Sequence, residues 1–148
     1  SSEVLEISED IPGSTFVVSG EDQHIFLPKN GIYTFEFIGK FQSAATANGI
    51  GITLANISAA TSDFIGTVSA QLTTSSMFES SFVSAGSPVI STDVPVASTD
   101  YAILMKGTFN VTSTGTVAVQ YRSENNGTLV RLQQGTVLII KSLDPALA

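Results

Sequence analysis

Residues 32–43, with the sequence IYTFEFIGKFQS, alternate between apolar and polar side chains. The odd positions carry Tyr33, Phe35, Phe37 and Phe41, and the even positions include Thr34, Glu36, Lys40 and Gln42. A period of two predicts a β-strand with one aromatic face and one polar face. In a two-sheet protein such an aromatic face serves either the core between the sheets or an interface between subunits. The sequence leaves both roles open.

The same alternation continues along the chain, and helical periodicity is hard to find. In residues 49–55, Ile50, Ile52 and Leu54 fall on one predicted face, and Gly49, Gly51 and Thr53 fall on the other. Further strands are predicted at residues 64–70, 77–83, 101–111, 117–121, 129–133 and 136–143. The chain is therefore predicted to be all-β.

Glycine-containing segments separate the last four predicted strands, at residues 112–115, 124–127 and 133–135. The dipeptide Asn126-Gly127 favours a tight hairpin turn, because both residues tolerate a positive φ. Residues 84–99 contain Pro88 and Pro95 and are predicted to be a loop or a broken edge strand. Short antiparallel strands joined by such turns predict a two-sheet sandwich or jelly roll.

The 148 residues are enough for one domain, and charge is unevenly distributed along them. The net charge is −7, and residues 1–22 contain acidic residues but no Lys or Arg. Four of these acids are Glu3, Glu6, Glu9 and Asp10. We therefore expect an acidic N-terminal arm at residues 1–22, followed by a domain at residues 23–148. The arm is either a solvated leader or a segment that docks on a basic surface of a partner protein.

Composition argues against several classes of partner. Nucleic-acid binding is not expected, because it requires clustered Lys and Arg to neutralise phosphates. No membrane span is expected, since the longest apolar run is 137–140 and a span needs about 20 residues. Cysteine is absent, so stabilisation by disulfides is excluded and oligomerisation is the expected substitute.

No arrangement typical of an enzyme, a metal site or a cofactor site stands out. His24 is the only histidine and has no nucleophile motif nearby, so a structural role is expected. Asp93 and Asp100 flank the proline-containing loop and could contribute to a calcium site, but a solvated loop is the preferred interpretation. Gly49 and Gly51 lack the third glycine and the helix of a dinucleotide motif. We therefore expect a protein that is not an enzyme.

Two segments together resemble a known family. Residues 31–56 (GIYTFEFIGKFQSAATANGIGITLAN) place an aromatic strand before SAAT and an Ile/Leu strand, and residues 101–143 end in RLQQGTVLIIKSL. They resemble the jelly-roll domains of tailed-phage virion proteins, which are similar in turn to the tumour-necrosis-factor and complement globular-head fold. The resemblance implies an antiparallel jelly-roll sandwich of about ten strands, preceded by an extended N-terminal arm, that assembles as a homotrimer. By position, it implies core or trimer-axis packing for Tyr33, Phe35, Phe37, Tyr101, Tyr121 and Ile139.

The resemblance also implies a function. Members of the family decorate capsids or form head and tail fibres, and the family has no active site to transfer. The short segment before the domain favours a capsid decoration protein whose arm, through Glu3, Glu6, Glu9 and Asp10, anchors it to the major capsid protein or another virion protein. It would be assembled in the bacterial cytoplasm and sit on the virion surface. The alternatives are a receptor- or glycan-binding fibre tip, and a glycan depolymerase, which would need a facing carboxylate pair.

Overall fold

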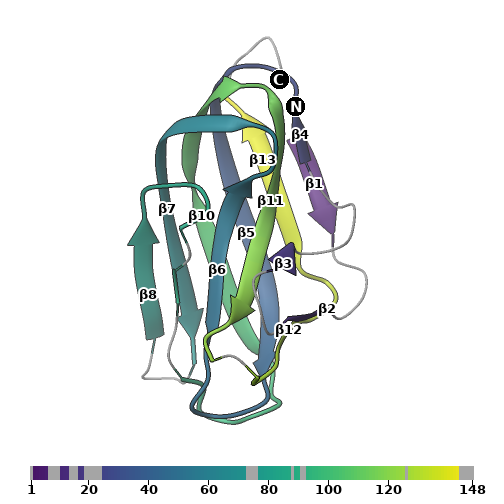
Figure 1. The fold of residues 1–148 in the computed structure, drawn as a ribbon, viewed down its shortest axis with the longest axis vertical. Coiled ribbons are helices and arrows are strands. Elements are labelled where there is room, and N and C mark those ends of the chain that lie inside the picture. The colour runs from purple at the N-terminus through teal and green to yellow at the C-terminus, as the bar shows by residue number, and fades with distance from the viewer. Residues whose placement is uncertain are drawn as a thin grey trace.

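The computed structural model describes residues 2–6, 11–13, 17–18, 25–72, 77–87, 89–90, 93–125 and 127–143, and their side chains from residue 25 onward except at 71, 89 and 90. In this part of the chain all regular structure is β-strand, and the strands form two antiparallel sheets packed face to face (Figure 1). The same part contains no helix that is long and apolar enough to cross a membrane.

Nine strands are described with their side chains, six in the first sheet and three in the second. In the first sheet these are β5 (Gly31–Ser43), β7 (Ala60–Gln71), β8 (Met77–Phe82), β10 (Tyr101–Ser113), β12 (Val130–Leu132) and β13 (Val137–Ser142). In the second they are β4 (Ile25–Leu27), β6 (Ile50–Asn56) and β11 (Gly115–Ser123). Four further strands are described by their backbone: β1 (Ser2–Glu6) and β2 (Ile11–Gly13) in the first sheet, and β3 (Val17–Val18) and β9 (Val89–Ile90) in the second.

The connectivity makes the sandwich a jelly roll. From β4 onward the chain passes repeatedly between the sheets: β4, β6, β9 and β11 lie in the second, and β5, the β7–β8 hairpin, β10 and β12–β13 lie in the first. Neighbours in a sheet are therefore distant in sequence, as in the pairing of β5 with both β10 and β13. The predicted fold class, an antiparallel two-sheet jelly roll, is confirmed.

The N-terminal segment runs along the sandwich where its backbone is described. β1 pairs with β13, β2 with β12 and β3 with β11. The division into an arm at residues 1–22 and a domain at residues 23–148 stays a prediction.

One expectation about turns is corrected. The predicted Asn126-Gly127 hairpin is wrong, because β11 lies in the second sheet and β12 in the first, so the two strands do not pair with each other. Asn126 itself lies outside the described residues. Residues 133–136 join β12 to β13, and both of these strands pair with β5. Within it, Gln133 N donates to Lys40 O at 2.9 Å, and Lys40 N donates to Thr136 Oγ1 at 3.3 Å.

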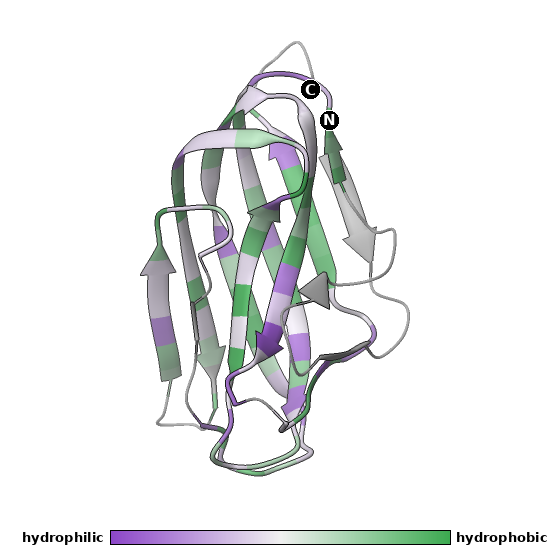
Figure 2. Ribbon diagram, viewed as in Figure 1, coloured by the Kyte–Doolittle hydropathy of each residue, from purple (hydrophilic) through white to green (hydrophobic). Residues whose placement is uncertain are grey.

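The core lies between the sheets and is rich in aromatic side chains. Phe109 on β10 is surrounded by Tyr33, Phe35 and Phe64, at ring-centroid distances of 5.8, 5.9 and 5.6 Å. Phe64 also contacts Phe82 on β8, at 5.2 Å. The inward and outward alternation behind this packing is visible in Figure 2 as changing bands of hydrophobic and hydrophilic colour along the strands. Aromatic contacts thus join β5, β10, β7 and β8.

The strand β6 differs from the predicted two-faced pattern. Ile50, Ile52 and Leu54 pack in the core, but Gly51, Thr53 and Ala55 on the other face are buried too. β6 lies between β11 and β9 in the second sheet, so both of its sides are flanked by neighbours. On β11, Arg122 lies opposite Gly51 and Gln120 lies opposite Thr53.

Candidate functional site

The structure separates the six residues predicted for core or trimer-axis packing. Tyr33, Phe35, Phe37 and Tyr121 are at most 3% exposed and lie in the core between the sheets. Tyr101 is half-buried against the core, and its hydroxyl accepts a hydrogen bond from Val96 N at 3.0 Å.

Ile139 is placed differently from the other five. It lies on the outer face of the first sheet, because its neighbours Leu138 and Ile140 point inward and are buried. The structure therefore brings the aromatic residues together in or against the core and leaves Ile139 on another surface.

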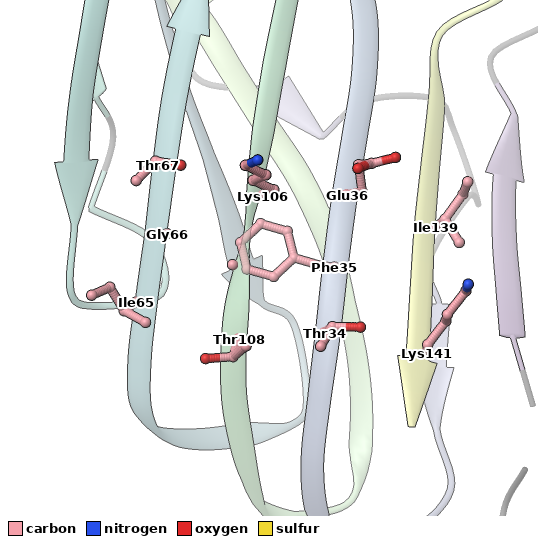
Figure 3. Close-up of a pocket in the computed structure, with 11 residues that line it drawn as sticks. Thr34, Phe35, Glu36, Ile65, Gly66, Thr67, Lys106, Thr108, Ile139 and Lys141 are labelled. Atoms are coloured by element: carbon pink, nitrogen blue, oxygen red, sulfur yellow. The ribbon is translucent and has the colours of Figure 1, made fainter. Parts of the chain in front are cut away.

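A groove of about 550 Å³ crosses this outer face over β13, β5, β10 and β7 (Figure 3). Two rows of outward-facing side chains line the groove, and in each row the residues lie opposite one another on neighbouring strands. One row is Ile139, Glu36, Lys106 and Thr67, and the next is Lys141, Thr34, Thr108 and Ile65. Figure 3 shows Ile65 and Ile139 on opposite sides of the groove, with Thr34, Glu36, Lys106 and Thr108 between them and the ring of Phe35 at the centre. The groove thus combines apolar groups at its sides and centre with outward side chains that carry both signs of charge.

The outer face carries more apolar surface than a sheet face open to water normally does. Ile32, Ile38 and Ile65 are 52%, 49% and 55% exposed, and Leu104 and Ile139 are half-buried on the same side. We call these five residues the outer apolar face. An antiparallel sheet commonly has one face on the core and a polar face toward water, so the isoleucines on this outer face depart from the usual pattern. Ile38 and Leu104 lie directly opposite each other, and clustered exposed apolar side chains mark an interaction site. Ile32 and Ile65 lie further along the sheet, beyond Glu36, Lys106, Thr34 and Thr108.

The sequence itself indicated that this face is partly apolar. Ile32 and Ile38 occupy even positions of residues 32–43, the side predicted to be polar. Two β-branched apolar residues among Thr34, Glu36 and Lys40 indicate that this side is not wholly exposed to water.

A second hollow, of about 430 Å³, is polar and lies at the end of the first sheet where β5 and β12 meet the loop before β10. Beside it, the Asp100 carboxylate accepts hydrogen bonds from Gln42 Nε2 at 2.8 Å and Gln133 Nε2 at 3.0 Å. Gln133 Oε1 is buried and has no hydrogen-bond partner among the described residues. These bonds place Asp100 in an amide cluster.

Titratable groups offer little chemistry in the described part of the chain. Burial raises the pKa of Tyr121 far above that of a free phenol, against the opposing effect of the Arg131 charge, so Tyr121 stays neutral. The described residues contain no group of three or more His, Asp or Glu side chains that could hold a metal ion. Glu9, Asp10 and His24 lie outside the described residues, and the side chains of Glu3 and Glu6 are not described either.

Comparisons with known proteins add little. No family model matches the chain, and no curated protein matches it. Among solved structures, one described as "Structure of infectious bursal disease virus Gx strain" matches with 8% identity and a TM-score of 0.26, covering 95% of this chain and 38% of that chain. The match is to a viral protein, but at this TM-score it carries no argument.

Proposed function

We propose that this chain is a non-enzymatic structural protein of a bacteriophage virion, a trimeric decoration protein on the capsid surface. The observation that carries the proposal is the outer apolar face on a compact jelly-roll sandwich. A β-sandwich that presents a second apolar surface is suited to assembly, since none of the described residues covers that surface and a second copy can.

Three copies packed around a three-fold axis would cover the outer apolar face. Ile38 and Ile65 lie on β5 and β7, with Glu36 and Lys106 directly opposite each other between them. The mixture of both charges allows copies of the same face to meet without net repulsion. Homotrimer formation thus also takes the place of the missing disulfides.

The acidic arm is the proposed anchor on the shell. Its partner would be a basic surface of the major capsid protein or of another virion protein. The backbone of β1 follows the edge of β13, so the segment with Glu3 and Glu6 is held beside the sandwich rather than far from it. The protein would be assembled in the bacterial cytoplasm and remain on the virion surface.

A receptor- or glycan-binding fibre tip is the second candidate. The polar hollow favours it, because the planar side chains of Gln42, Gln133 and Asp100 can pair with sugar hydroxyls. A glycan array probed with the whole chain separates the two functions, since a protein that only decorates the shell gives no specific signal.

The anchoring proposal is tested on particles of the virus that encodes the chain. Glu3→Gln, Glu6→Gln, Glu9→Gln and Asp10→Asn together remove the charges of the arm but keep the backbone that pairs with β13. We expect the wild-type chain to rebind stripped particles and the neutralised chain to show an at least tenfold lower occupancy, measured by quantitative mass spectrometry. Added salt should weaken wild-type binding, because exposed ionic contacts are screened.

A control substitution on the opposite sheet, Thr116→Gln, should leave occupancy unchanged. Equal occupancy for the neutralised and wild-type chains would refute the anchoring role. Failure of the wild-type chain to bind particles at all would refute the decoration function.

A further inference from the structure

The strand β8 forms an open edge of the first sheet. Among the described strands the order ends at β8, which pairs with β7 on one side, and Figure 1 draws no described strand beyond it. Four of its six residues are exposed. An edge strand presents unpaired N–H and C=O groups that can pair with another strand. The segment of residues 77–82 contains no Lys and no Pro, which often protect such an edge, and Glu79 is its one charged residue.

An exposed apolar side chain flanks this edge at each end. Met77 at the start of β8 is 56% exposed, and Val83, directly after its end, is 71% exposed. Ile65, on the neighbouring strand β7, is exposed as well. An edge with a single charge and an apolar side chain at each end can accept an added strand.

We propose that two copies of this chain pair through β8, antiparallel, around a two-fold axis that passes Ser80. In this register Ser80 lies opposite Ser80 of the second copy, and Glu79 lies opposite Ser81. Phe78 lies opposite Phe82, and Met77 lies opposite Val83. The first sheets of the two copies then form one continuous sheet.

This register is the most favourable of the symmetric registers that keep the faces of the two sheets aligned. Centring the pair on Glu79 places two carboxylates directly opposite each other, which destabilises the pair. Centring it on Ser81 places Glu79 opposite the apolar Val83 and separates the two phenylalanines. Centring it on Ser80 avoids the carboxylate contact and creates aromatic cross-strand pairs, which stabilise antiparallel strands.

The edge pairing is independent of the proposed trimer and uses another surface. The trimer would cover the outer apolar face, whereas the two-fold contact joins backbone groups in the plane of the sheet. An isologous contact of this kind is self-complementary and closes on itself. On a protein that also forms trimers, it would link one trimer to the next.

The test measures mass by light scattering over a series of protein concentrations. Ile38→Lys places a charge in the outer apolar face and should abolish the trimer. The edge contact alone should then give this variant a dimer mass of about 31 kDa, twice the 15.4 kDa protomer. Adding Ser80→Lys places two like charges opposite each other and should shift the mass to that of a monomer. Mixing this double variant with Ile38→Lys/Ser80→Glu should restore the dimer, because opposite charges then face each other.

Ser113→Lys, an exposed position at the end of β10, is the matched control and should leave the dimer intact. A monomer for Ile38→Lys at every concentration would overturn the edge pairing and leave the trimer proposal standing. A mass that stays at three protomers would instead refute the assignment of the trimer to the outer apolar face.

A cysteine variant tests the edge pairing without the Ile38 substitution. Because the chain has no cysteine, Ser80→Cys should form a disulfide-linked dimer on oxidation, whereas Ser113→Cys should not. Equal cross-linking of the two variants, or none in Ser80→Cys, would also overturn the proposed register.

Discussion

Asn48 shows how one side chain can join the two sheets. It is 1% exposed, and its Nδ2 donates to Ser43 Oγ at 3.0 Å. Its Oδ1 accepts from Ser123 Oγ at 2.9 Å and from Asn125 N at 2.8 Å. Ser43 ends β5 in the first sheet, and Ser123 ends β11 in the second. The amide therefore holds the ends of two strands from different sheets at a fixed separation.

Asn48→Ala should lower the free energy of unfolding by about 2–4 kcal/mol. The substitution removes three hydrogen bonds and leaves buried partners unsatisfied, each at a cost of about 1–3 kcal/mol, partly offset by relaxation and water. Urea unfolding followed by circular dichroism, at one protein concentration, measures the change. Asn30→Ala, which loses one exposed bond to Thr112 O, should cost less than about 1 kcal/mol. Equal losses in the two variants would contradict the assigned role of Asn48.

At the scale of elements, the pairing of β10 with β7 depends on two facing glycines. Gly107 lies opposite Gly66 in the register, beside an irregularity between Thr108 and Asn110. A Cβ at Gly107 would stand 2.0 Å from Ile65 O and 2.7 Å from Gly66 Cα. Both atoms belong to the backbone and cannot rotate away. The close approach of these strands therefore requires glycine at position 107.

Gly107→Ala should destabilise the protein by about 3 kcal/mol, since overpacking costs about 1–3 kcal/mol and here the backbone itself must shift. Thermal unfolding monitored by circular dichroism measures the effect as a lower Tm. Gly39→Ala is the matched comparison, because its Cβ would meet the methyl group of Thr136 at 2.9 Å, and a side chain can move. A Gly107→Ala variant as stable as Gly39→Ala would show that β7 and β10 can separate without cost.

At the scale of the whole molecule, the first sheet has two different apolar surfaces. Its inner face packs against the second sheet, with Phe37, Phe41 and Met105 fully buried. Its outer face carries Ile38 and Ile65, each about half exposed. The inner face explains folding of the single chain, and the outer face is the basis of the proposed assembly.

In a Ser80→Lys variant, which lacks the proposed edge pairing, the outer apolar face alone should give a trimer of about 46 kDa, three times the 15.4 kDa protomer, in size-exclusion chromatography with light scattering. The wild-type chain, with both contacts, should be larger. Ile38→Lys should remove the trimer, because a buried unpaired charge at an interface costs several kcal/mol. Ile57→Lys is a control in the bend directly after β6, at a similarly exposed position, and it should leave the trimer intact. A wild-type mass of 15.4 kDa at all concentrations would remove the support for the trimeric decoration protein.

Several features followed from the sequence alone, because they depend on local geometry. Alternation along residues 32–43 places successive side chains on opposite faces of any strand, so the shared face of Phe35 and Phe37 could be predicted without knowing their neighbours. That this face packs in the core of the single chain was decided by the tertiary structure. The all-β class and the sandwich architecture followed in the same way. The strand positions agreed closely for β5, β8 and β10.

Other features were decided only by the tertiary structure, because they depend on which strands become neighbours. A turn dipeptide such as Asn126-Gly127 favours a local hairpin, but the jelly-roll connectivity sends β11 and β12 into different sheets. Ile139 carries the same chemistry as Ile140, yet one faces outward and the other faces the core, since register sets the side. Strand pairing across the chain brings Ile38, Ile65 and Leu104 onto one surface, and no local pattern contains that information.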